Sequence, residues 1–135
     1  MPLLLDTGIL YALADRRDDW HRRARKLVDS AEAALLVAVT VLPEVCYLLR
    51  ERLGAAAELR FVESLAAREL AVEELRDGDL ERCAALLQRY PEIGFVDASV
   101  VAVAERLRLR AIATTDRRHF APIRPRHTAA FELLP

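Results

Sequence analysis

The chain has 135 residues, a formal net charge of −1, 53% hydrophobic residues and only 6% aromatic residues. This length suits one domain with its own core, so we expect a single domain over residues 1–135, and the near-neutral charge argues against a generic nucleic-acid coat. A core so poor in aromatic residues must be built from Ala, Leu and Val, which suits helices packed on a buried sheet.

The N-terminal segment MPLLLDTG carries no basic region, and its apolar run is too short for a signal peptide or a membrane span. Cys46 and Cys83 lack the CxxC spacing of a metal or redox motif, and both lie in segments of helical periodicity. We therefore expect reduced, buried thiols in a cytoplasmic protein with no membrane segment.

The first half of the chain alternates short apolar runs with segments of helical periodicity. Asp6 follows the first apolar run directly and stands at the start of a helix. Thr40 is predicted to be the N-cap of a later helix that carries Glu44 in its first turn and stops at Gly54. The predicted elements here are a strand at 3–5, helices at 7–14 and 19–31, a strand at 34–39 and a helix at 40–54.

The second half continues the alternation. Asp97 opens a nearly all-apolar helix, and Asp116 closes an apolar run and precedes a polar turn at 117–119. The predicted elements are helices at 55–67, from 77 or 79 to about 90, and at 95–107, with strands at 70–72, at 111–115 and within 123–134. Such alternation predicts an α/β fold, a three-layer α/β/α sandwich with a mainly parallel central sheet.

Four carboxylates stand inside apolar stretches, whereas most other acidic residues have polar neighbours in the sequence. An ionised carboxylate in apolar surroundings loses several kcal/mol of hydration unless a cation or strong donors replace the water. Ligands of parallel α/β sheets bind outside the carboxyl ends of the strands, where these acids are expected to converge. The four are Asp6, Glu44, Asp97 and Asp116.

Each acid alone has an ordinary explanation as a helix cap, a partner of a helix dipole or the start of a turn. Together they favour a site for Mg²⁺ or Mn²⁺, which prefer hard oxygen ligands. Zinc is disfavoured because neither the cysteines nor the histidines have ligand spacing. A metal held by carboxylates can activate water and stabilise charge on a phosphodiester, so no histidine base is needed. The sequence leaves open whether one or two metals bind.

Arginine outnumbers lysine 19 to 1, and several arginines flank the first and last acidic motifs. Arg16, Arg17, Arg117 and Arg118 are candidates for contacts to a phosphate backbone, which would position a nucleic-acid strand without reading its bases. The alternative is that these arginines simply belong to solvated helix faces.

The order and spacing of four motifs resemble those of the PIN domain family, and most of all the VapC-type ribonuclease toxins of bacterial toxin–antitoxin pairs. LLLDTGILYAL resembles the family's first strand, Asp-Thr and following helix, and TVLPEV its glutamate segment. GFVDASVVAVAERL resembles its mid-chain Asp helix, and IATTDRRHF its T-x-D-x-x-F ending. The resemblance covers essentially the whole chain, residues 1–135.

The resemblance implies a metal-dependent endoribonuclease with RNA as substrate and Mg²⁺, or else Mn²⁺, as cofactor. Carried over by position, Asp6, Glu44, Asp97 and Asp116 would be the catalytic, metal-coordinating acids. Thr7 would support them, and Thr114 would support Asp116 by hydrogen bonding. It also implies a homodimer, and a cognate antitoxin whose segment inserts near the site, often with an arginine that pairs with the acids.

One position departs from the family pattern. Gly8 stands where Ser or Asn usually follows Asp-Thr, so a polar contact near Asp6 is expected to be missing unless a water replaces it.

Three other functions share features with this sequence. The tripeptide DTG occurs in aspartic proteases, but those enzymes are almost wholly β and rich in glycine turns. A phosphorylation-switched receiver needs a lysine after its last strand, whereas Lys26, the only lysine here, lies in an early helix. A PIN-like domain that binds RNA or protein without cleaving it stays open, because Gly8 favours it while the retained acids oppose it.

Overall fold

A computed structural model describes residues 1–135 and contains one five-stranded sheet in which every pair of neighbours is parallel. The strand order is β3-β2-β1-β4-β5, so the first strand of the chain lies at the centre. The strands are β1 (Leu3–Leu5), β2 (Leu35–Ala38), β3 (Ala71–Glu73), β4 (Ala111–Ala113) and β5 (Glu132–Leu134).

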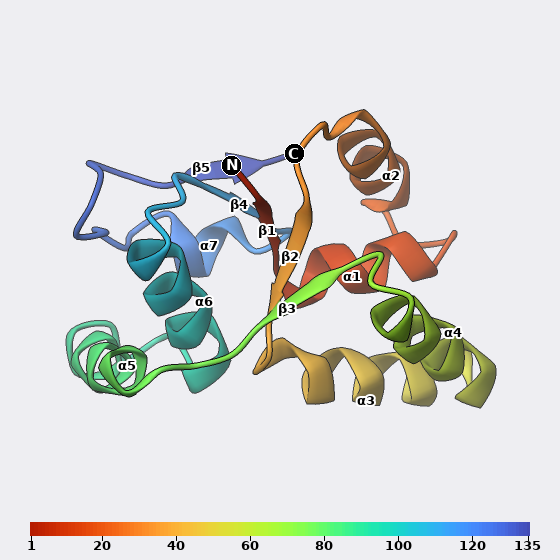
Figure 1. Cartoon of the computed structure of the whole chain (residues 1–135), viewed down its shortest axis with the longest axis horizontal. Helices are drawn as coiled ribbons and strands as arrows, with labels where there is room; N and C mark the ends of the chain where they lie inside the picture. Colours follow the sequence, from red (N-terminus) through yellow and green to blue (C-terminus); the bar gives the residue numbers. More distant parts are fainter.

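Seven helices cover the two faces of this sheet. Figure 1 shows α1 to α4 on one side of the strands and α5, α6 and α7 on the other, which confirms the predicted three-layer α/β/α architecture. The helices are α1 (Thr7–Ala14), α2 (His21–Ser30), α3 (Val41–Leu53), α4 (Ala55–Ala66), α5 (Asp77–Arg89), α6 (Phe95–Arg106) and α7 (Arg117–Phe120).

The core is aliphatic, as the composition predicted. All of β1 is buried, and in α6 every residue from Ala98 to Ala104 is buried, because this helix packs between the sheet and α5. Phe120 is the largest fully buried side chain, with 1% of its surface exposed. Burying a side chain of this size contributes roughly 2–3 kcal/mol, so Phe120 anchors α7 against the core.

Several local predictions were wrong in detail. The second helix begins at His21 and not at Asp19, and the strand expected within 123–134 spans only Glu132–Leu134. Thr40 is the N-cap residue of α3, but its hydroxyl bonds to that of Ser99 and caps nothing. Cys83 is buried as expected, whereas Cys46 is only half-buried, and both thiols are free.

The polar turn expected at residues 117–119 is the short helix α7. Its four residues are too few for a helical repeat to show in the sequence, and the burial of Phe120 decides its position.

The topology places the end of β1 between the ends of β2 and β4. Leu4 pairs with Leu36 on one side and with Ile112 on the other. The residue that follows β1 is therefore surrounded by sheet and helices on several sides. No helix in the structure combines the length and the apolar character that a membrane crossing requires.

Candidate functional site

Asp6 lies at the carboxyl end of the central strand and is only 4% exposed. Its N–H donates to the carbonyl of Ala113 on β4 (2.9 Å), which fixes its backbone to the neighbouring strand. It occupies the N-cap position of α1, yet its side chain makes no capping hydrogen bond. The explanation of Asp6 as a helix cap is therefore wrong, and its carboxylate is free for contacts outside the helix.

The two carboxylate oxygens of Asp6 have different surroundings. Oδ2 accepts a hydrogen bond from the Thr114 hydroxyl (3.0 Å), whereas Oδ1 is buried and has no hydrogen-bond partner. Burial raises the pKa of Asp6 from 3.8 to about 7, and the negative charges of Asp97 and Glu44 push it in the same direction. An orphaned buried oxygen of this kind is what a bound cation would satisfy.

Thr114 links the first and last acidic motifs. Its hydroxyl donates to Asp6 and accepts the backbone N–H of Asp116 (2.9 Å), and the residue is fully buried. The resemblance predicted that Thr114 supports Asp116. In the structure the Thr114 hydroxyl contacts two groups, the backbone N–H of Asp116 and the side-chain carboxylate of Asp6. The hydroxyl of Thr7, the other expected supporting residue, is buried without a partner.

Asp97, Asp116 and His119 form a tight cluster. Nδ1 of His119 lies 3.1 Å from Oδ2 of Asp97 and 2.8 Å from Oδ2 of Asp116. One ligand atom from each of the three residues falls within 4.8 Å of the other two. Burial raises the pKa of Asp97, the His119 charge opposes that shift, and Asp116 and Glu44 add to it.

His119 was not predicted from the sequence to lie beside the acids. Its position on α7 follows from the N-cap, because the Asp116 carboxylate accepts the backbone N–H of His119 (3.1 Å). The motif DRRH contains the spacing of a capping pair, and this was the signal that could have placed the ring beside the acids. The ordinary explanation of Asp116 was the start of a turn, whereas the residue is the N-cap of α7, and this role does not remove Asp116 from the site.

Glu44 differs from the other three acids. It lies in the first turn of α3 and is exposed, so the expectation that all four carboxylates sit in apolar surroundings is wrong for Glu44. Its neighbours in the sequence are apolar because the opposite face of α3 is buried. Its charge nevertheless acts on both Asp6 and Asp97.

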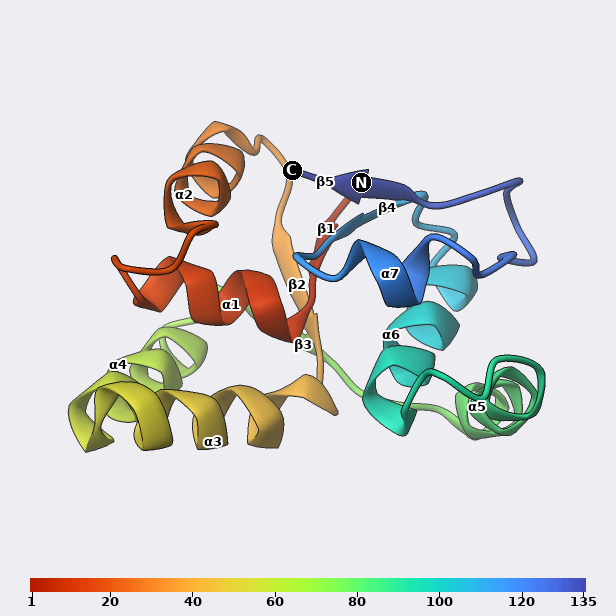
Figure 2. The ribbon, with the colours of Figure 1, turned by 180° about the vertical axis from the view of Figure 1, so that it is seen from behind.

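The starts of four helices carry these acids to one place. In Figure 2 the first turns of α1, α3, α6 and α7 gather around the end of β1, and the mutual charge effects among the acids agree with that view. Helix N-termini carry partial positive charge, which offsets part of the repulsion among carboxylates. The site thus runs from buried Asp6, through partly exposed Asp97 and Asp116, to exposed Glu44.

Gly8 has a spatial explanation. A Cβ built on Gly8 would lie 2.1 Å from Oγ1 of Thr115, so the Thr115 hydroxyl already occupies the space that a side chain at position 8 would need. The polar group that the family pattern puts at this position is absent, and the hydroxyl of Thr115, from the loop after β4, lies there in its place.

The four candidate arginines lie in different settings. Arg118 is exposed and lines a hollow of about 420 Å³ together with His119, next to the acids. The guanidinium of Arg117 donates to the carbonyls of Leu133 and Pro135 and is therefore engaged with β5. Arg16 lines a separate groove, and Arg17 is exposed near it.

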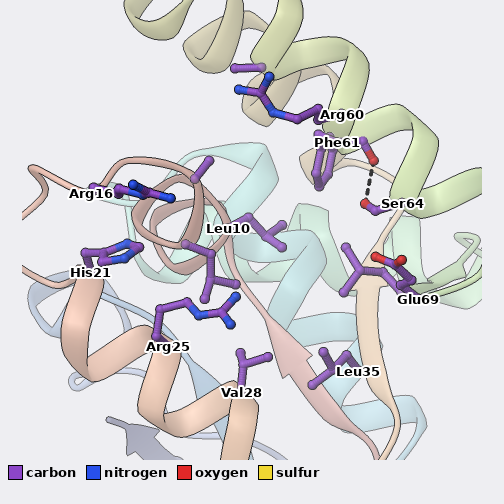
Figure 3. Close-up of a pocket in the computed structure, with 14 residues that line it drawn as sticks. Leu10, Arg16, His21, Arg25, Val28, Leu35, Arg60, Phe61, Ser64 and Glu69 are labelled. Atoms are coloured by element: carbon purple, nitrogen blue, oxygen red, sulfur yellow. Dashed lines mark hydrogen bonds between the residues drawn. The ribbon is translucent and has the colours of Figure 1, made fainter.

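That separate groove lies between α1, α2 and α4 and has a volume of about 870 Å³ (Figure 3). Leu10 and Phe61 belong to its apolar wall, and Arg16, Arg25 and Arg60 reach it from three different elements. None of the four acids lines it. The molecule therefore offers an acidic site and, apart from it, a partly apolar groove lined by three arginines and one glutamate, Glu69.

The sequence matches the family profile described as PIN domain over residues 3–124. It is 33% identical to Ribonuclease VapC26 of Mycobacterium tuberculosis, a match that covers 98% of this chain and 100% of that protein. Among solved structures, the Sarcin-Ricin loop cleaving toxin VapC20 of M. tuberculosis superposes with a TM-score of 0.80 at 24% identity. The alignment covers 87% of this chain and 92% of that chain.

A chain of a toxin-antitoxin complex from Klebsiella pneumoniae superposes with a TM-score of 0.72 at 25% identity. The alignment covers 90% of this chain and 92% of that chain. The fold, the order of the acidic motifs and the profile match agree. The chain belongs to the PIN domain family.

Proposed function

We propose that this protein is a metal-dependent endoribonuclease that hydrolyses RNA phosphodiester bonds and serves as the toxin of a toxin–antitoxin pair. Its near-full-length similarity to a VapC ribonuclease supports RNA as the substrate class. The single observation in the structure that carries metal dependence is the Oδ1 atom of Asp6, which is buried, without a partner, and within the electrostatic reach of two further acids.

The donor set fits Mg²⁺ or Mn²⁺, since it consists of carboxylate oxygens in a partly solvated site. Asp6, Asp97, Asp116 and Glu44 would hold the ion, and Thr7 and Thr114 would support them. When bound, the ion supplies positive charge that stabilises the phosphodiester as it is attacked and promotes deprotonation of the attacking water.

The chain's own residues prepare this chemistry. Thr114 holds the Asp6 carboxylate in one orientation and spaces it from Asp116, because a single hydroxyl contacts both residues. The graded exposure leaves the outer acids accessible to RNA, while the buried end of the site excludes bulk water from Asp6. Low dielectric around Asp6 strengthens every charge interaction made there.

RNA is held near the acids by positive side chains. Arg118 is the best placed of the four predicted arginines because it is exposed beside His119. Arg16 and Arg17 would contact the backbone farther from the cleavage point, and Arg117 would have to leave its carbonyl partners first. Contacts of this kind position a strand without reading its bases.

Whereas the resemblance implied a segment that inserts near the acidic site, we assign an antitoxin segment to the groove between α1, α2 and α4, which lies apart from the acids. Its apolar wall suits a hydrophobic helix face, and its arginines suit acidic residues on that segment. The similarity to a solved toxin-antitoxin complex supports such a partner. A double variant, Arg25→Glu with Arg60→Glu, should weaken the complex in a pull-down with the co-expressed antitoxin and leave RNA cleavage unchanged. Undiminished capture would place the antitoxin elsewhere.

We also propose a homodimer in the cytoplasm, where RNA substrates are found. Tyr47, Leu59 and Val62 on α3 and α4 are large apolar side chains that are 66%, 59% and 45% exposed, and a second copy would cover such surface. Light scattering coupled to size exclusion measures the mass directly, and a monomer at micromolar concentration would contradict the dimer.

The proposed activity is tested with purified protein and a labelled RNA pool. The wild-type protein should cleave the RNA in Mg²⁺ or Mn²⁺ and should stop cleaving when a chelator is added. Asp6→Asn and Asp97→Asn should each lower the cleavage rate by orders of magnitude while the circular dichroism spectrum stays unchanged. Asp29→Asn, at an exposed ion pair on α2, is the matched control. Cleavage that survives both site substitutions would show that these acids are not the catalytic group.

A further inference from the structure

We propose that His119 is a ligand of the divalent metal, through Nδ1, together with Asp97 and Asp116, and that this nitrogen makes the outer part of the site prefer Mn²⁺ over Mg²⁺. The inference rests on the proposed metal-dependent function and adds a ligand that the four acids alone do not contain. The sequence predicted that no histidine base is needed, and a histidine ligand is compatible with that prediction.

The distances fit a shared ion. Neighbouring ligands of an octahedral ion with bonds of about 2.1 Å lie about 3 Å apart. Nδ1 of His119 lies 3.1 Å from Asp97 Oδ2 and 2.8 Å from Asp116 Oδ2. These are also hydrogen-bond distances, so Nδ1 binds an ion in the tautomer that carries its proton on Nε2. The nitrogen and two oxygens come from α6, from the loop after β4 and from α7, and they lie within 4.8 Å of one another, as ligands of one ion do.

The ring is held in place by the fold. Phe120, the next residue, is 1% exposed and fixes α7 against the core. The backbone N–H of His119 donates to Oδ1 of Asp116, so the same carboxylate that faces Nδ1 with one oxygen caps the helix with the other. The side chain of His119 is 33% exposed, which leaves solvent access for an incoming ion.

The chemical consequence is selectivity. Mg²⁺ binds almost only oxygen and keeps several waters, whereas imidazole is a good ligand for transition metals. A site made of carboxylates alone should bind Mg²⁺ and Mn²⁺ with similar affinity. A site with one imidazole nitrogen should bind Mn²⁺ more tightly than Mg²⁺. We expect loss of the ring to lower Mn²⁺ affinity on the order of tenfold or more and to change Mg²⁺ affinity much less.

The test uses the purified full chain with Mn²⁺ as the probe. Pulsed electron paramagnetic resonance detects a directly bound nitrogen as ¹⁴N modulation of the Mn²⁺ echo, and calorimetry gives the Mn²⁺ and Mg²⁺ affinities without any turnover. Wild type should show the nitrogen signal and His119→Gln should lose it. The matched control His21→Gln should keep it, because His21 lies in the separate groove with its Nδ1 against the carbonyl of Ala12.

The outcomes separate this inference from the function on which it rests. Mn²⁺ bound by wild type with no nitrogen signal, and with equal affinity in His119→Gln, would overturn the ligand and leave a carboxylate-only metal nuclease. A wild-type protein that binds neither ion would overturn the proposed function as well. The wild-type spectrum is informative even if His119→Gln folds poorly, since the signal is sought in the native protein first.

Discussion

At the scale of single residues, the Asp6 side chain stays protonated over a pH range in which an unburied aspartate is ionised. The folded pKa is about 7 because burial disfavours the charged form, against 3.8 for an unburied carboxyl. Between these values the unfolded chain binds fewer protons than the folded one, so stability falls as pH rises. In chelator, the free energy of unfolding should therefore decrease from about pH 4 to about pH 7, by at most about 4 kcal/mol.

Urea titrations at several pH values measure this slope. Asp6→Asn should flatten it and should be more stable than wild type at pH 7, because an amide carries no charge to bury. Asp29→Asn, on an exposed helix face, should keep the wild-type slope. If the Asp6 variant has the same pH dependence as wild type, burial does not control this carboxyl.

The contact between Gly8 and Thr115 makes a second prediction at this scale. Alanine favours a helix by about 1 kcal/mol over glycine, but a Cβ at position 8 would meet the Thr115 hydroxyl at 2.1 Å. We expect Gly8→Ala to cost about 1–3 kcal/mol through overpacking.

A double-mutant cycle isolates that contact. In a Thr115→Ala background the same Gly8→Ala change should be neutral or stabilising, and Gly78→Ala, where no atom lies within 4 Å of the new Cβ, should not destabilise. Equal costs of Gly8→Ala in both backgrounds would mean that some other neighbour limits the space.

At the scale of elements, α5 and α6 are joined by a partly buried ion network around Asp79. The Arg106 guanidinium donates to both oxygens of Asp79 (3.0 Å each) and to Glu73 (3.0 Å), and Asp79 is 3% exposed. Arg106→Gln would leave the Asp79 carboxylate buried and short of its partner, which should lower the free energy of unfolding by about 3 kcal/mol.

The exposed pair of Arg50 and Glu58 is the matched comparison. The Arg50 side chain is 62% exposed, so Arg50→Gln should cost less than about 1 kcal/mol. Chemical denaturation of both variants gives the two numbers side by side, and similar costs would refute the special role of the partly buried network.

The elements also show which features a sequence can predict. Strand β1 and helix α6 were predicted closely because their apolar runs are long or continuous, and the four acids could be located because they interrupt such runs. The helix α7 was missed because tertiary packing of Phe120, and not local periodicity, forms it. The exposure of Glu44 was missed for a related reason, since apolar neighbours in a helix can all face away from the residue between them.

The position of His119 beside the acids could not be predicted because it depends on how α6 and α7 pack. The sequence shows a histidine three residues after an aspartate, but Asp97 is 22 residues earlier in the chain, and only the packed structure brings its carboxylate to the ring. The ordering of acids from buried to exposed has the same origin, because it depends on where each helix start lies in the sheet.

At the scale of the whole molecule, metal binding should stabilise the fold. The acids repel one another without an ion, and a ligand that binds only the native state adds about 2.7 kcal/mol at a hundredfold excess over its dissociation constant. We expect Mn²⁺ and Mg²⁺ to raise the melting temperature of wild type at pH 7.5, and Asp97→Asn to lose most of that rise. Calcium-free buffer with chelator gives the baseline, and an unchanged melting temperature in millimolar metal would contradict the site.

The hydroxyl of Thr114 that orients Asp6 has a consequence for how the protein is made. The two residues are 108 positions apart, and β1 finds its neighbour β4 only at residue 111 and beyond. A ribosome that synthesises this chain from the N-terminus therefore carries the first acid long before the strand and the hydroxyl that complete its surroundings. The surroundings of Asp6 are complete only near the end of translation, so we expect any activity that depends on this carboxylate to appear only in the finished chain.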